Sequence, residues 1–147
     1  MTASLVGHEM HNDLLNQLES INQWWPDLRQ ASVSAMNARE VMTRLAELRT
    51  VLKEHFQFEE AQGLLPGGAS ADPRFARQAE ELMEQHEELL ERLNAVVGSV
   101  PLVSESPQGW AIAKGHFDEF RKQLEAHERA EIDLLQVASA ENLGVGD

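Results

Sequence analysis

Residues 41–60 carry the clearest structural pattern in the chain and read VMTRLAELRTVLKEHFQFEE. Apolar side chains recur there at steps of three and four residues, at Val41, Leu45, Leu48 and Leu52. Such steps place side chains on one face of an α-helix. The same steps lead on to His55 and Glu59, which therefore share that face. We predict an amphipathic helix in which an imidazole and a carboxylate continue the apolar stripe.

The rest of the chain repeats this helical period. Strand signals are nearly missing, since the chain has no Tyr and no clean alternation of apolar and polar residues. Four amphipathic segments cover residues 4–25, 32–62, 70–97 and 106–138. The breakers that end the first three are Pro26, Gly63 and Gly98. Short connections make neighbouring helices antiparallel. We predict an all-α protein, an up-down-up-down antiparallel four-helix bundle over residues 1–138, followed by a flexible C-terminal tail over residues 139–147.

The composition narrows the range of functions. A chain of 147 residues allows one domain with a real core. Its 12 Lys and Arg against 25 Asp and Glu give a net charge of −13, which repels nucleic acid and anionic membrane surfaces. The chain has no cysteine, so any metal must be held by N and O donors. It has neither an export signal nor a long apolar run, and we expect a cytoplasmic protein with no membrane or nucleic-acid partner.

Polar side chains interrupt the apolar stripe of every predicted helix. His11 lies on the stripe of the first helix and His86 on that of the third. His127 lies on the stripe of the fourth helix, where Glu131 follows about one turn later. Along the chain, a single His is followed by His-x-x-x-Glu, and this order occurs twice. Burying an imidazole or a carboxylate in a bundle core is costly unless each has a partner.

Four imidazoles and two carboxylates suit two adjacent divalent cations. Glu59 and Glu131 would bridge the cations and the histidines would bind them terminally, leaving positions open for water, hydroxide or a small gas. A donor set of imidazole and carboxylate without thiolate favours iron first, and manganese or zinc next. A metal-free bundle with vestigial histidines is the structural alternative.

These motifs resemble those of the hemerythrin-like, HHE cation-binding family, from about His8 to Leu135. The resemblance implies a four-helix up-down bundle around a non-haem di-iron centre with an oxo or hydroxo bridge. It implies that the metal ligands are His11, His55, Glu59, His86, His127 and Glu131. By the same resemblance, His11 and His55 would cap one iron ion, and His86 and His127 would cap the other.

Two positions depart from the oxygen-carrying hemerythrins. Those proteins have a second histidine one turn before the third-helix ligand, where this chain has Leu82. They also have an aspartate five residues after the last histidine, where this chain has Ile132. We therefore expect a function other than simple oxygen transport. Leu82 is expected to keep the ligand pocket small and dry, together with Leu15, Leu48, Leu52 and Phe120.

Two functions follow as hypotheses. The first is a module that binds or senses O2, NO or iron itself. The second is a di-iron redox enzyme that handles peroxide or NO, or repairs damaged iron centres. The expected partner in both is a diatomic or peroxide-sized ligand, and a redox partner and a homodimer stay open.

Three further polar residues receive separate predictions. His8 precedes His11 by three residues and is either a surface residue, which we favour, or a replacement ligand. His116 lies about three turns before His127, too far to bind the same cations, and a structural role is expected. Glu60 is either part of a solvated helix face, which we favour, or a hydrogen-bond partner of a metal-bound imidazole.

Overall fold

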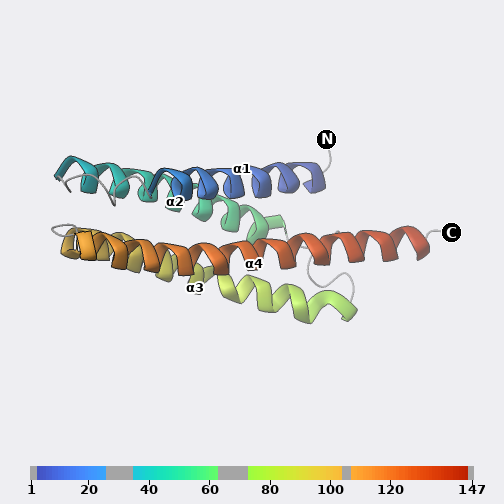
Figure 1. The fold of residues 1–147 in the computed structure, drawn as a ribbon. Coiled ribbons are helices and arrows are strands. Elements are labelled where there is room, and N and C mark those ends of the chain that lie inside the picture. Colours follow the sequence, from blue (N-terminus) through green and yellow to red (C-terminus); the bar gives the residue numbers. More distant parts are fainter. Residues whose placement is uncertain (1–2, 26–34, 63–72, 104–106, 146–147) are drawn as a thin grey trace.

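The computed structural model describes residues 3–25, 35–62, 73–103 and 107–145. Its four helices are α1 (Ala3–Trp24), α2 (Ala35–Gln62), α3 (Pro73–Val103) and α4 (Pro107–Val145). No strand occurs in the described ranges. Consecutive helices run in opposite directions (Figure 1). The prediction of an all-α, up-down-up-down bundle is confirmed.

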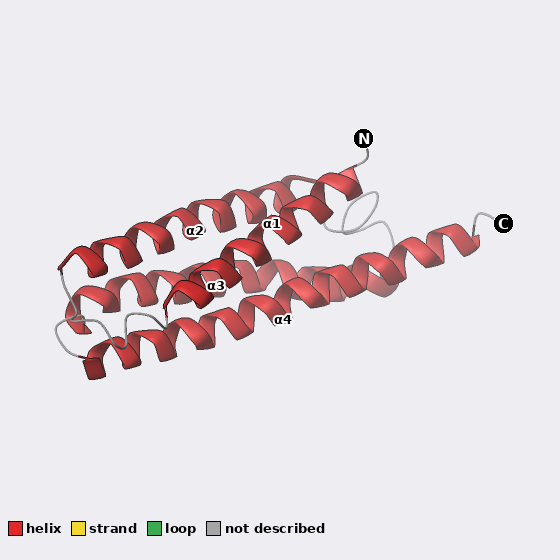
Figure 2. Cartoon of the chain, turned by 45° about the horizontal axis from the view of Figure 1, so that its top comes forward, coloured by secondary structure: helices red, strands yellow, loops and turns green. Residues whose placement is uncertain are grey.

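The helices close into a bundle because each packs against the next along the chain and α1 also packs against α4. Seen from a second direction, the C-terminal end of α4 extends past the ends of the other helices (Figure 2). Within the described ranges, no helix combines the length and the apolar character needed to cross a membrane.

Two apolar clusters fill the interior. The larger joins all four helices, and its largest side chains are Leu14, Leu18, Trp25, Leu45, Leu48, Leu52, Phe56, Leu93, Trp110, Phe117, Phe120 and Leu124. The smaller lies between α3 and α4 and is built on Ala79, Leu82, Leu134 and Ala138. Along α4 the larger cluster ends at Leu124 and the smaller begins at Leu134. The predicted site residues of this helix, His127 and Glu131, lie between the two clusters.

The helix ends differ from the predicted ones at two places. Gly98 is predicted to end the third helix, and this prediction is wrong, since α3 continues to Val103. Val96 and Val100 are both buried, so the helix keeps burying apolar surface beyond Gly98. Pro101 removes only one backbone hydrogen bond, close to the helix end.

The other difference concerns α4, which continues past the predicted end at 138 to Val145. The flexibility expected of residues 139–147 stays a prediction. The predicted helix starts at residues 32, 70 and 106 lie outside the described residues, as do residues 26–31, 63–69 and 104–105 before them.

Gly98 offers a test of the continuous α3. It is exposed, and a Cβ built on it meets nothing within 4 Å. Because alanine has a better helix propensity than glycine, Gly98→Ala is expected to raise the free energy of unfolding by about 0.5–1 kcal/mol. Urea unfolding followed by circular dichroism measures this change. Ala95→Gly, at an exposed position of the same helix, is the reciprocal control and should lower it by a similar amount; a destabilised Gly98→Ala would contradict a helical residue 98.

Candidate metal centre

Seven buried polar side chains lie between the two apolar clusters. They are His11, His55, Glu59, His86, His127, Glu128 and Glu131, and each is at most 5% exposed. All four helices contribute to them. No Lys or Arg is buried among the described residues. Three carboxyl groups therefore share the interior with four imidazoles and with no side chain that is permanently cationic.

Six of these residues form two groups that overlap in two carboxyl groups. The first group is His11, His55, Glu59 and Glu131, and the second is Glu59, His86, His127 and Glu131. Within each group the four possible ligand atoms lie within 4.8 Å of one another. The six residues predicted from the sequence thus meet in the predicted pairs. Two cations bound here would lie side by side, with Glu59 and Glu131 between them.

The inner nitrogens of the histidines face the two shared carboxyl groups. Nε2 of His55 lies 3.1 Å from Oε1 of Glu59, and Nε2 of His86 lies 3.5 Å from the same oxygen. Nε2 of His86 is 3.4 Å from Oε1 of Glu131, against which Nε2 of His127 also lies. Nε2 of His11 is 3.6 Å from Oε2 of Glu131. Each shared carboxyl group therefore contacts a histidine of both groups.

The outer nitrogens of three histidines are held by oxygen atoms. Nδ1 of His86 donates to Oε1 of Glu60 at 3.2 Å, the less favoured of the two roles considered for Glu60. Nδ1 of His127 donates to Oε1 of Gln85 at 2.7 Å, and Nδ1 of His11 donates to Oε2 of Glu128. Because these oxygens accept, Nδ1 carries a proton, and a neutral ring with Nδ1 protonated would offer Nε2 to a cation. This is the tautomer that an Nε2-bound metal requires.

Phe56 fixes the orientation of the rings on one side of the site. Its ring stacks on that of His86 with the centroids 3.8 Å apart and an angle of 5° between the planes. The Phe56 and His127 rings pack edge to face, with an angle of 75° between their planes and the centroids 5.6 Å apart. Phe56 is fully buried in the larger cluster, so the packing of the core positions two of the four imidazoles.

The two shared carboxyl groups differ in their charge. Burial and the neighbouring Glu131 raise the pKa of Glu59 to about 12, so Glu59 is a neutral acid at pH 7. Burial also acts to raise the pKa of Glu131, but the imidazoles of His127 and His86 outweigh it and hold that pKa well below its usual range. Without a bound cation, therefore, only one of the two bridging positions is ionised.

Glu128 and His11 form a buried ion pair. Burial opposes the ionisation of Glu128, yet His11 and His55 beside it lower its pKa. Burial by itself would lower the pKa of His11, but its hydrogen bond to Glu128 raises that pKa above the ordinary value. Glu128 is therefore an anion in the interior and depends on the histidines for its charge balance.

Two cations fit the atoms that have no partner. Nε2 of His55, both oxygens of Glu59 and Oε2 of Glu131 are buried and have no hydrogen-bond partner among the described residues. Leaving such atoms unsatisfied in an apolar interior costs roughly 1–3 kcal/mol each. All of them are donors that divalent metals accept, and they converge on the space between the helices. The residues present thus suit a dinuclear metal centre.

Comparison with known proteins agrees with this geometry. Residues 6–101 match the model of the hemerythrin HHE cation-binding domain. The chain belongs to the hemerythrin HHE cation-binding family. The match includes His11, His55, Glu59 and His86, whereas the site residues of α4 lie beyond it. Neither the comparison with curated proteins nor that with solved structures found a match.

The structure adds one residue to the set predicted for an HHE site. Glu128 is fully buried beside His11, and the sequence reasoning overlooked it. The signal was present, because a step of four from Leu124 reaches Glu128 and a step of three from there reaches Glu131. The stripe of α4 is wide enough at this point to bury both His127 and its neighbour.

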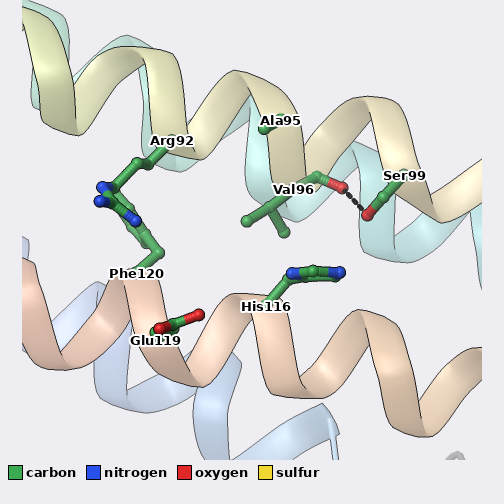
Figure 3. Close-up of a pocket in the computed structure, with 7 residues that line it drawn as sticks. All are labelled: Arg92, Ala95, Val96, Ser99, His116, Glu119 and Phe120. Atoms are coloured by element: carbon green, nitrogen blue, oxygen red, sulfur yellow. Dashed lines mark hydrogen bonds between the residues drawn. The ribbon is translucent and has the colours of Figure 1, made fainter.

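The remaining predictions concern residues around the HHE site. Leu82 is buried in the smaller cluster, but Leu15 is only half-buried and the fully buried Leu14 takes the inward position. The side chain of His8 lies outside the described part of the structure. His116 is exposed and belongs to neither group of possible ligands. It lines a surface pocket between α3 and α4, across from Val96 and Ser99 (Figure 3).

Proposed function

We propose that this HHE protein is a non-haem di-iron protein that binds or senses a small ligand, O2 or NO, at a carboxylate-bridged centre. The observation that carries the proposal is the overlap of the two four-residue groups in Glu59 and Glu131. A pair of carboxyl groups that belongs to both ligand groups can bridge two adjacent ions. His11 and His55 would cap the first ion, and His86 and His127 the second.

The donor set supports iron. Imidazole and carboxylate without thiolate suit iron, with manganese and zinc as the nearest competitors. Two nitrogens and two oxygens for each ion leave coordination positions open. When bound, iron supplies reversible binding of diatomic molecules and one-electron redox chemistry.

The protein around the centre favours a small ligand. Apolar clusters lie on both sides of the site and restrict water and large molecules. A groove of about 290 Å³ between α3 and α4 is lined by Gln85, Leu89 and His127. The groove reaches the side of the His127 ring that Gln85 holds, opposite the nitrogen that faces Glu131.

Iron content and the optical spectrum test this proposal. Protein purified under iron-replete conditions should contain two irons per chain and absorb in the near ultraviolet, where bridged ferric pairs absorb. Reduction should bleach the band, and O2 or NO added to the reduced protein should generate a new spectrum that is reversed by removing the gas. One zinc per chain, or no stoichiometric metal, would refute the proposal.

A second candidate is a di-iron redox enzyme that acts on peroxide or NO. The observation that favours it is the buried Leu82, which takes the position of a further histidine and leaves the ion near His86 with an additional open position. Turnover distinguishes the two functions. An enzyme consumes many equivalents of peroxide or NO per iron pair, whereas a binding protein takes up about one.

Gln85 is expected to tune one of the two ions. It is an exposed residue of α3 whose amide oxygen accepts the Nδ1 proton of His127. Gln85→Ala removes this acceptor, so the affinity of the His86 and His127 ion should fall about 10- to 100-fold. Competition with a chromophoric chelator measures both affinities. Glu84→Ala, at the exposed neighbouring position, should leave them unchanged; equal affinities in Gln85→Ala and wild type would show that the hydrogen bond has no such role.

A further inference from the structure

Glu128 contacts the histidines of only one of the two ligand groups. Its Oε2 accepts the Nδ1 proton of His11, and its Oε1 lies 3.1 Å from Nε2 of His55. Both histidines belong to the same group of possible ligands. Oε1 is buried and has no hydrogen-bond partner within the described residues. Glu128 is fully buried, so no bulk water offsets its charge.

Glu128 touches the first ligand group at two points. Its Oε2 sits on Nδ1 of His11, and a cation on Nε2 would lie on the opposite side of that ring, so the His11 imidazole stands between Oε2 and the ion. Its Oε1 lies beside Nε2 of His55, the nitrogen that faces Glu59, so the second oxygen adds negative charge on the same side of the centre. A carboxylate in this position fixes the ring and its tautomer, and it makes the ligating nitrogen more basic.

In the other ligand group, the residues that accept the Nδ1 protons of the histidines carry less effective charge. His127 is held by Gln85, which carries no charge. His86 is held by Glu60, whose side chain is 54% exposed, so water screens its charge. The buried anion thus stands behind His11 alone, although the two groups have identical sets of ligands.

We infer that Glu128 is a positioning residue that makes the two metal positions unequal, holding His11 in place and giving its ion the more electron-rich environment. This inference rests on the proposed di-iron function. The ion at His11 and His55 binds first on loading and is the harder of the two to reduce. The ion at His86 and His127, beside the groove lined by Gln85, is the one that changes oxidation state more readily.

The test compares variants that change one hydrogen-bond acceptor at a time, loaded anaerobically with 57Fe(II). Wild type should give two Mössbauer doublets of equal area. Glu128→Gln keeps an oxygen for Nδ1 of His11 but removes the charge, and it should shift only one doublet and raise one of the two reduction potentials. It should also weaken the first Fe(II) bound about 10- to 100-fold. Glu60→Gln should shift the other doublet.

The opposite substitution tests the same inference without disturbing the core. Gln85→Glu places a carboxylate behind His127 at an exposed position, where water screens its charge as it does for Glu60, so it should lower the second reduction potential by less than Glu128→Gln raises the first. Glu119→Gln, at an exposed position of α4, is the matched control and should change neither doublet.

Two results would overturn the inference. One is a Glu128→Gln protein with the doublets, potentials and affinities of wild type, and the other is an equal shift of both doublets. If Glu128→Gln does not fold, Glu128→Asp takes its place, since the shorter side chain withdraws the carboxylate from Nδ1 of His11, and unchanged doublets and potentials in that protein overturn the inference. A wild-type protein that holds no pair of irons refutes the proposed function instead, and the inference with it.

Discussion

Glu59→Gln is expected to abolish the binding of both cations and, at the same time, to stabilise the metal-free protein. Both ions are lost together because Glu59 belongs to both groups of ligands, and an amide oxygen is a poor bridge. The gain in stability has a different cause. Burial and Glu131 raise the pKa of Glu59 to about 12, so folding at pH 7 forces this carboxyl group to take up a proton. Glutamine is neutral already, so it is buried without taking up a proton.

The size and the pH dependence of this effect follow from the pKa. A raised pKa means that the contribution of Glu59 to stability is fully present below its ordinary value of 4.5 and is lost as the pH rises toward 12. The cost grows by about 1.4 kcal/mol per pH unit, which gives up to about 3 kcal/mol at pH 7. The advantage of Glu59→Gln should therefore be near zero at pH 4.5 and increase steadily up to pH 8.

Chemical unfolding of both metal-free proteins at pH 5, 6, 7 and 8 measures this advantage, and metal analysis of the reloaded proteins measures the loss of binding. Glu54→Gln, at an exposed position of the same helix, is the control and should change neither quantity. A Glu59→Gln protein that retains one ion would contradict the bridging position. A stability difference independent of pH would contradict the buried neutral acid.

Loading with metal should stabilise the fold more than any single substitution. Each ion that binds the native state alone adds about 4 kcal/mol when its free concentration is a thousand times its dissociation constant. For a chain of this length, two ions should therefore raise the melting temperature by roughly 10 °C or more. The metal would satisfy buried atoms of all four helices, including Nε2 of His55 and Oε2 of Glu131.

Scanning calorimetry with and without Fe(II) or Co(II) under anaerobic conditions measures this increase. A chelator should reverse it, and Glu59→Gln should show none of it. Acid should also remove it, because protons compete with the metal for histidine and carboxylate ligands. An equal rise in wild type and in Glu59→Gln would point to cations bound at the acidic surface and would contradict an interior site.

The bundle and the six central residues could be predicted because helical spacing states directly which side chains share a face. Val41, Leu45 and Leu48 are fully buried, and His55 and Glu59 follow them on the same stripe, as predicted. The end of α3 could not be found in this way, because the preference of Gly98 for a helix end is local and weak. The burial of Val96 and Val100 against other helices outweighs it.

The residues that accept hydrogen bonds from the outer nitrogens of the histidines are not specified by helical spacing, for a different reason. Gln85 and His127 are 42 positions apart, and their hydrogen bond depends on how α3 is aligned along α4. No periodicity within one helix specifies that alignment. Glu128 is absent from the predicted set, although its step of four from Leu124 places it on the buried stripe of α4.

The most direct test of the dinuclear centre is anomalous diffraction at the iron edge from crystals of the iron-loaded protein. Two peaks are expected about 3.5–4 Å apart, which is the separation usual for ions that share bridging ligands. One peak should lie beside the nitrogens of His11 and His55 and the other beside those of His86 and His127, with Glu59 and Glu131 between them. A single peak, or peaks only at surface carboxylates, would contradict a centre built on two shared carboxyl groups.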